Sequence, residues 1–137
     1  MEQIKVFVDT NIVLDYFCGR MGDMCAKTIV QFGKDPRIEL CVSILTAINA
    51  LYIIKKYATT VKPDEIARKF RILPQDYGQY CNAQTINIDD FEDALQLACA
   101  VSGGCRVFVT RDRHLLDADI RSIMVLSPEE FIEKVKL

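Results

Sequence analysis

The feature that most constrains the fold is the run VFVDTN at residues 6–11. Three apolar residues, two of them β-branched, lead directly into an acidic residue and two small polar residues, and an amphipathic segment follows. This order predicts a buried strand over residues 4–9 that ends in a carboxylate, Asp9, and a helix over residues 11–18. In open α/β sheets, ligands bind at the carboxyl ends of the strands, so Asp9 is expected to point into a binding crevice.

Length and composition predict one domain with a substantial core. The chain has 137 residues, of which 50% are hydrophobic and 26% are charged, and we expect a single domain over residues 1–137. No apolar run reaches the roughly 18 residues that a membrane helix needs. The first five residues, MEQIK, lack the pattern of a signal peptide, so we expect a cytoplasmic protein without a membrane segment.

The six cysteines do not form a recognisable metal or disulfide framework. No pair has a Cys-x-x-Cys spacing, and His114 is the only histidine. Structural zinc sites need several close nitrogen or sulfur ligands, usually in short paired spacings. Cys41 and Cys99 lie within apolar segments, so we predict reduced and mostly packed thiols.

Strand-like and helix-like segments alternate along the chain. Besides the two segments above, the pattern predicts strands at 38–42, 70–73, 106–110 and 124–126, and helices at 23–33, 63–70, 91–102, from 44 and from 128. Residues 75–85 are ambiguous and fit one helix. Ser43 and either Asp89 or Asp90 are predicted helix N-caps. The alternation predicts an α/β fold, a three-layer α/β/α sandwich with a central parallel sheet of four to five strands.

Three aspartates have similar predicted settings although they lie far apart in the sequence. Asp9 ends the first strand, Asp93 lies in the first turn of a helix, and Asp112 follows the strand at 106–110. A parallel sheet brings these positions to one edge, so we predict a cluster of carboxylates in one crevice. Clustered like charges repel and raise each other's pKa. A bound Mg²⁺ or Mn²⁺ would remove that cost, because hard cations prefer oxygen ligands.

Each aspartate also has an ordinary structural explanation. Asp9 fits a helix N-cap, Asp93 fits a carboxylate that favours a helix dipole, and Asp112 fits a turn residue. The metal-site hypothesis therefore depends on one fold that brings all three aspartates to the same edge of the sheet.

A carboxylate site of this kind favours phosphodiester hydrolysis over other chemistries. A divalent cation can activate water and neutralise charge on a phosphodiester. The chain has no Gly-x-Ser-x-Gly, no Gly-x-Gly-x-x-Gly and no P-loop, and its one histidine has no obvious nucleophile partner. The net charge of −2 argues against binding nucleic acid by general charge. Without the three aspartates the charge would be +1, so a nuclease whose cations reverse the local field is compatible with the composition.

Four stretches together make the sequence similar to PIN-domain proteins. They are VFVDTN at 6–11, VSILT at 42–46, DFEDAL at 90–95 and VTRD at 109–112, and their order and spacing match over nearly the whole chain. The resemblance implies a PIN-like α/β/α sandwich with a parallel sheet. It also implies a Mg²⁺- or Mn²⁺-dependent endoribonuclease that acts on RNA, as VapC-type toxins do, an antitoxin protein as partner, and a homodimer.

The resemblance assigns roles to the matching positions. Asp9 and Asp93 would be primary metal ligands and catalytic residues, and Asp112 would complete the site directly or through water. Three neighbouring polar residues would orient these carboxylates or the nearby backbone: Thr10, Asn11 and Thr110.

Two arginines flank the expected crevice. Arg111 and Arg113 are candidates for contacts with substrate phosphate, although an exposed arginine is more often only a solvated charge. Asp15, on the helix beyond Asp9, is predicted to have a surface role.

The sequence departs from the family pattern at one position. The acidic residue that is usual on the helix after the second strand falls on Asn49. Asparagine offers a carbonyl oxygen but no negative charge, so metal binding is expected to be weaker unless another carboxylate compensates. Glu92 is the first candidate, although a first-turn glutamate that favours the helix dipole explains it equally well. Asp117 and Asp119 are more distant candidates.

Three classes of function are compatible with these patterns. The first is a metal-dependent endoribonuclease. The second, which Asn49 motivates, is a catalytically weak or inactive PIN module that binds nucleic acid or a protein partner. The third is a phosphoryl-transfer or phospho-receiver domain, which shares an aspartate after the first strand. Asn11 breaks the Asp-x-Asp pattern of aspartyl phosphatases, and Pro74 stands where a receiver would carry its aspartate.

Overall fold

A five-stranded parallel sheet organises the structure, a computed structural model that describes residues 3–57 and 60–136. The strands are β1 (Ile4–Val8), β2 (Ile38–Ser43), β3 (Arg71–Leu73), β4 (Val107–Val109) and β5 (Met124–Leu126). Their order across the sheet is β3-β2-β1-β4-β5, and every neighbouring pair is parallel. The first strand of the sequence is therefore the central strand of the sheet.

The strand order reverses beside β1. The chain moves outward from β1 through β2 to β3, then crosses to β4 on the other side of β1 and continues to β5. Phe7 of β1 lies opposite Cys41 on one side and Phe108 on the other. Because successive connections leave β1 and β4 in opposite directions, their carboxyl ends form the switch point at which open α/β sheets bind ligands.

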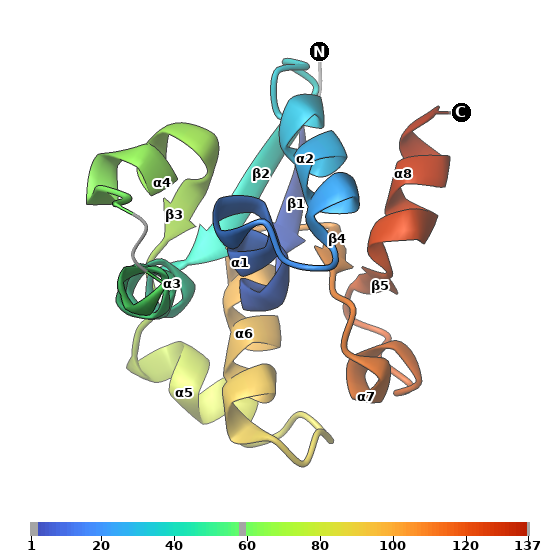
Figure 1. Cartoon of the computed structure of the whole chain (residues 1–137). Helices are drawn as coiled ribbons and strands as arrows, with labels where there is room; N and C mark the ends of the chain where they lie inside the picture. The colour runs from blue at the N-terminus through green and yellow to red at the C-terminus, as the bar shows by residue number, and fades with distance from the viewer. Residues whose placement is uncertain (1–2, 58–59, 137) are drawn as a thin grey trace.

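Helices cover both faces of the sheet (Figure 1). They are α1 (Thr10–Cys18), α2 (Asp23–Phe32), α3 (Ile44–Lys56), α4 (Pro63–Lys69), α5 (Tyr77–Ala83), α6 (Phe91–Ser102), α7 (Arg113–Leu116) and α8 (Pro128–Lys136). Side chains of α1, α2, α3, α4 and α8 pack on one face, and those of α6 and α7 pack on the other. α5 packs against α6. This three-layer α/β/α sandwich with a parallel sheet confirms the predicted fold class.

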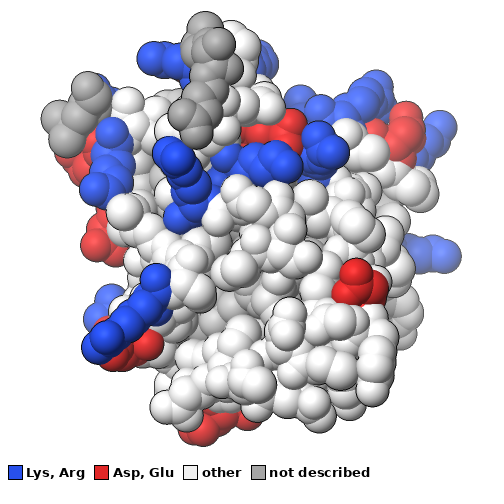
Figure 2. Space-filling model, turned by 180° about the vertical axis from the view of Figure 1, so that it is seen from behind, with Lys and Arg blue, Asp and Glu red and all other residues white. Residues whose placement is uncertain are grey.

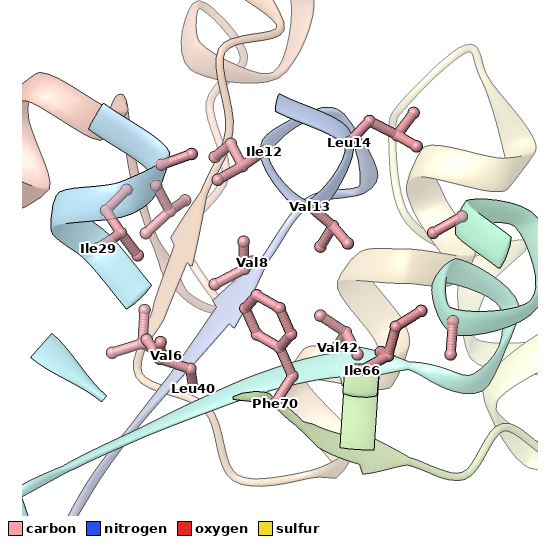
Figure 3. Close-up of a cluster of buried hydrophobic side chains, with 14 of the residues drawn as sticks. Val6, Val8, Ile12, Val13, Leu14, Ile29, Leu40, Val42, Ile66 and Phe70 are labelled. Atoms are coloured by element: carbon pink, nitrogen blue, oxygen red, sulfur yellow. The ribbon is translucent and has the colours of Figure 1, made fainter. Parts of the chain in front are cut away.

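The core on the first face fixes α1 against the central strands (Figure 3). Alternate residues of two strands point toward it: Val6 and Val8 of β1, and Leu40 and Val42 of β2. Apolar side chains from α1, α2, α4 and the residue before β3 fill the space against them: Ile12, Val13, Leu14, Ile29, Ile66 and Phe70. The turn between β1 and α1 therefore has a fixed position in the fold.

The core on the second face fixes β1 against β4. Phe7 and Phe108 are fully buried, and their rings stack with centroids 5.0 Å apart and planes 15° from parallel. Leu97 of α6 and Leu115 of α7 belong to the same cluster. This contact sets the relative position of the two strands just before they end in polar residues.

Most of the predicted helices and strands agree with the structure. Ser43 caps α3 by accepting a hydrogen bond from the Thr46 amide at 2.9 Å, and Asp90 rather than Asp89 caps α6. The ambiguous stretch at 75–85 contains α5, which Asp76 caps. The short helix α7 was not predicted, because four residues carry too little periodicity to distinguish a helical turn from a loop.

Two predictions from composition are tested by the structure. All six cysteines are free thiols, as predicted, and Cys41, Cys99 and Cys105 are buried. Within the described ranges, every helix is too short or too polar to cross a bilayer. Met1 and Glu2, which begin the segment used for the signal-peptide prediction, lie outside the described residues.

Apart from the acidic first turn of α6, the surface formed by α5 and α6 carries few charges. Residues 77–88 and 94–105 contain no Asp, Glu, Lys or Arg. Seen from behind, Lys and Arg gather mainly in the upper half of the molecule, and the lower half of that face is largely uncharged (Figure 2). Three exposed aromatic rings contact one another where α5 meets α6: Tyr77, Tyr80 and Phe91.

The stacked pair predicts a large loss of stability on truncation. Phe108→Ala is expected to lower the free energy of unfolding by about 3–5 kcal/mol, because it leaves a cavity against Phe7. Denaturant unfolding followed by circular dichroism measures this change. Met21→Ala, at a side chain that is 95% exposed, is the control and should change stability by no more than about 0.5 kcal/mol. Similar losses in the two variants would contradict the assignment of Phe108 to the core.

Candidate functional site

Asp9 caps α1 at the carboxyl end of β1 and is only 7% exposed. Its Oδ1 accepts a hydrogen bond from the Thr10 amide at 2.8 Å, and its Oδ2 accepts one from the Thr110 hydroxyl at 2.7 Å. Burial raises the pKa of Asp9, and the carboxylates of Asp112 and Glu92 raise it further, whereas the two hydrogen bonds oppose the shift. The two interpretations of Asp9, helix cap and crevice carboxylate, are therefore compatible.

Thr110 connects Asp9 to Asp112. Its buried hydroxyl donates to Asp9 and accepts a hydrogen bond from the Asp112 amide at 3.0 Å. Asp112 in turn caps α7, because its Oδ1 accepts a hydrogen bond from the His114 amide at 2.9 Å. One threonine thus fixes the ends of β1 and β4 relative to each other.

Asp93 lies in the first turn of α6 and is half-buried, with Glu92 exposed beside it. Its pKa is raised to about 7, first by burial and then by the carboxylates of Asp90, Asp9, Asp112 and Glu92. The fold therefore brings together the three aspartates that the sequence predicted to cluster, with Glu92 and Asp90 beside them. Asp90, whose Oδ1 accepts from the Asp93 amide at 3.1 Å, was predicted only as a cap.

An open pocket lies beside this cluster. It has a volume of about 630 Å³ and is lined by Asn87, Ile88, Asp89, Asp90, Asp93, Asp112, His114 and Ala118. A larger hollow, of about 870 Å³, lies between α1, α2 and α4 and is lined by residues that include Tyr16, Lys27 and Arg68. None of the predicted site residues lines the larger hollow, so chemistry rather than volume identifies the site.

The donor set at the cluster fits a hard divalent cation. Its side chains offer carboxylate and hydroxyl oxygens, which Mg²⁺ and Mn²⁺ prefer. Burial raises the pKa of Asp9 and of Asp93, and neighbouring carboxylates raise both further, so negative charge at the cluster is unfavourable without a bound cation. In residues 3–57 and 60–136, no three acidic, histidine or cysteine side chains converge as a preformed ligand set. Mg²⁺ commonly takes only one or two carboxylates and keeps several waters, which suits such an open arrangement.

A buried polar network that the sequence did not predict lies below Asp9. Gln96 of α6 is 2% exposed, and its Nε2 donates to the Thr46 hydroxyl at 2.6 Å and to the Thr10 hydroxyl at 3.4 Å. The two threonine hydroxyls are 2.8 Å apart. Thr10 therefore links α1 to α3 and α6, and helical spacing from Asp93 to Gln96 was the signal available in the sequence. Asn49 lies one turn beyond Thr46 on α3 and is partly exposed.

The predicted surface role of Asp15 is wrong. Asp15 is 1% exposed, and its carboxylate binds two arginines. Arg20 Nε donates to Oδ1 at 3.0 Å, while Arg111 donates from Nη2 to Oδ1 at 2.9 Å and from Nε to Oδ2 at 2.7 Å. The sequence pattern concealed this role, because both partners lie outside α1 and one is 96 residues away.

Other predicted site residues have partners away from the carboxylate cluster. The Asn11 side-chain oxygen accepts a hydrogen bond from Arg20 at 3.3 Å, so this amide contacts the arginine rather than Asp9. Arg113 pairs with Asp117 on the exposed side of α7 at 3.2 Å. Asp119 pairs with Arg121 at 3.3 Å. These pairs are exposed, as expected for solvated charges.

Comparisons with known proteins agree with this fold. Residues 5–114 match the PIN domain family. The chain is 26% identical over 145 aligned positions to a protein named Ribonuclease VapC1 from Aquifex aeolicus (strain VF5), and the match covers 98% of this chain and 97% of that protein. A solved structure titled "Toxin-antitoxin complex from Klebsiella pneumoniae" has a TM-score of 0.69 at 23% identity, covering 90% of this chain and 97% of that one.

The family match covers most of the chain, and the chain belongs to the PIN-domain family. The matched range includes the ends of β1 and β4 and the first turn of α6, so it contains the whole carboxylate cluster. The structural likeness, at its low sequence identity, supports the fold.

The pKa of Asp93 predicts how the stability of the metal-free protein changes with pH. A carboxyl group whose pKa rises from 3.8 when unfolded to about 7 when folded stabilises the fold below this range. That contribution is lost as pH rises through the range, because the unfolded state then holds fewer protons than the folded state. We expect a lower denaturation midpoint near pH 8 than near pH 5 in EDTA.

Asp93→Asn should reduce this pH dependence, and Asp117→Asn, at an exposed ion pair, is the matched control that should retain it. The carboxyl group of Asp35, whose pKa Arg37 lowers to about 2, changes stability only at more acidic pH. Equal pH dependence in the wild type and the Asp93 variant would contradict the assignment.

Proposed function

We propose that the protein is a divalent-metal-dependent endoribonuclease that hydrolyses phosphodiester bonds in RNA. The observation that carries this proposal is the position of Asp9, Asp93 and Asp112, whose carboxylates interact at the switch point of the sheet. Membership in the PIN-domain family and similarity to a protein named Ribonuclease VapC1 support the choice of reaction and substrate.

The residues of the cluster have distinct roles in this proposal. Asp9 and Asp93 hold the cation, Asp112 completes the site directly or through water, and Glu92 adds negative charge. A bound Mg²⁺ or Mn²⁺ supplies activation of water and neutralisation of charge on the phosphodiester. Thr110 holds the Asp9 carboxylate in place and fixes the backbone at Asp112.

The alternative is a catalytically weak or inactive PIN module that binds nucleic acid or a protein. Asn49 favours this alternative, because an amide replaces the acidic residue usual on α3 and brings no negative charge. The phospho-receiver alternative loses support, because Pro74 rather than an aspartate follows β3.

We propose an antitoxin protein as a partner, by analogy with the structural neighbour from a toxin–antitoxin complex. A homodimer is a further part of the proposal. The exposed aromatic contacts among Tyr77, Tyr80 and Phe91 support it, since clustered exposed apolar side chains often mark interfaces. We also propose that the chain functions as one domain in the cytoplasm.

Cleavage of RNA tests the proposal directly. The purified protein is expected to cleave RNA in Mn²⁺ or Mg²⁺ and not in EDTA, when messenger, transfer and ribosomal RNA are assayed separately. Asp9→Asn should reduce the rate by about a hundredfold or more, since it removes a charge that holds the cation. Asp117→Asn is the matched control and should retain the rate. Absence of metal-dependent cleavage in every RNA class would overturn the catalytic proposal.

Asn49→Glu distinguishes an active enzyme from the weaker module. In both cases the added carboxylate is expected to tighten Mn²⁺ binding by about tenfold in calorimetry. Cleavage that begins only in this variant would favour the weak module. Equal cleavage by the wild type and the variant would favour the enzyme and show that the site lacks no essential charge.

A further inference from the structure

A buried carboxylate holds two guanidinium groups at the edge of the candidate site. Asp15 Oδ1 accepts hydrogen bonds from both Arg20 and Arg111, so the two cations meet at one oxygen. Arg111 makes a second bond to Oδ2, which gives a bidentate pair. A buried carboxylate without such partners would be strongly unfavourable, so these bonds allow the Asp15 carboxylate to be buried.

The three side chains together carry a net charge of +1. The side chains of Arg20 and Arg111 are 34% and 39% exposed, so both reach solvent. Their Nη1 groups have no hydrogen-bond partner in the part of the chain that the structure describes. Two adjacent cations that share one carboxylate repel each other, and an anion bound to their open sides would reduce this repulsion.

The ion-paired side chains of Asp15, Arg20 and Arg111 lie beside the carboxylate cluster. Arg111 is between Thr110, which binds Asp9, and Asp112 in the chain. Its pKa is raised first by the hydrogen bonds to Asp15, and the charge of Asp9 adds to the shift. Arg111 is therefore close enough to Asp9 to interact with its charge, while the first turn of α6 carries the acidic Glu92 and Asp93.

The α1–α2 turn packs closely against the ion pair between Asp15 and Arg111. A Cβ atom at Gly22 would collide with the Asp15 carboxylate and would contact Arg111. Arg20, from the same turn, also donates to the main-chain oxygen of Asn11 at 3.2 Å. Both arginines are thus held on their inner sides by the protein, and their outer sides are free for a ligand.

We propose that Arg20 and Arg111 form a phosphate subsite, oriented by Asp15, for a backbone phosphate of RNA that lies beside the carboxylate cluster. Guanidinium groups match phosphate oxygens in geometry and retain their charge, which suits them to this ligand. The subsite relies on the proposed function only in taking RNA as the substrate. Asp15 is a positioning residue here, because it acts through the arginines.

Binding of a short single-stranded RNA in EDTA tests the subsite without cleavage. Fluorescence anisotropy should show about tenfold weaker binding for Arg20→Gln and for Arg111→Gln at low salt. The slope of log affinity against log salt should fall by about 0.7 for each lost phosphate contact. Arg121→Gln, at an exposed pair with Asp119, is the control and should change neither quantity. Unchanged affinity and slope in both subsite variants would overturn the proposal.

Asp15→Asn separates positioning from simple charge. This variant is one unit more positive, so general attraction predicts tighter RNA binding, whereas loss of orientation predicts weaker binding. Circular dichroism must show that it is folded; if it is not, Arg111→Lys replaces it, since it keeps the charge but loses the bidentate geometry. Tighter binding by Asp15→Asn, or unchanged binding by Arg111→Lys, would contradict the assigned geometry.

Inorganic phosphate provides a second probe. It should raise the melting temperature of the wild type in EDTA more than that of Arg111→Gln. If neither phosphate nor RNA binds the wild type, the subsite is overturned. RNA binding that needs both arginines, without cleavage under any metal condition, would retain the subsite and overturn the nuclease. RNA cleavage and RNA binding that are unchanged when either arginine is replaced would retain the nuclease and overturn the subsite.

Discussion

The hydrogen bond from the Thr110 hydroxyl to the buried Asp9 carboxylate joins the two strands between which the sheet order reverses. It spans 101 residues of sequence at 2.7 Å, and it has this geometry because the Phe7–Phe108 stack fixes β1 beside β4. The same hydroxyl accepts from the Asp112 amide, so the position of one acidic residue determines that of the next. The relative positions of Asp9 and Asp112 in the candidate site therefore depend on Thr110.

The two buried aspartates, Asp15 and Asp9, differ in how the surrounding protein balances their negative charge. Asp15 has two arginines as partners, and its negative charge is more than balanced. The carboxylate of Asp9 has hydroxyl and amide donors as its hydrogen-bond partners, and burial and then its acidic neighbours raise its pKa, as they do for Asp93. The balanced charge of Asp15 beside an acidic cluster with raised pKa values is the contrast that supports the proposal of an external cation at that cluster. This contrast is the physical basis of the proposed metal site.

The sequence predicted the parts of this structure that depend on local patterns. Strand and helix periodicity, the Ser43 cap and the apolar run before Asp9 all have short-range signals, and they led to the correct α/β/α sandwich. The strand order and the partners of Asp15 depend on contacts between distant segments, so neither could be read from spacing. The assignment of Asp15 to the surface failed for this reason, because a lone acidic residue on an amphipathic helix normally faces solvent. Gln96 was missed since its neighbours are apolar and its polar partners lie on other helices.

The position of a bound cation tests this account most directly. Crystals grown with Mn²⁺ and measured at a wavelength where manganese scatters anomalously would locate the ion without reference to activity. We expect an anomalous peak bonded to carboxylate oxygens of Asp9 and Asp93, with Asp112 bound directly or through a water. A peak elsewhere on the protein, or no peak at saturating Mn²⁺, would contradict the assignment of the uncompensated cluster as a metal site.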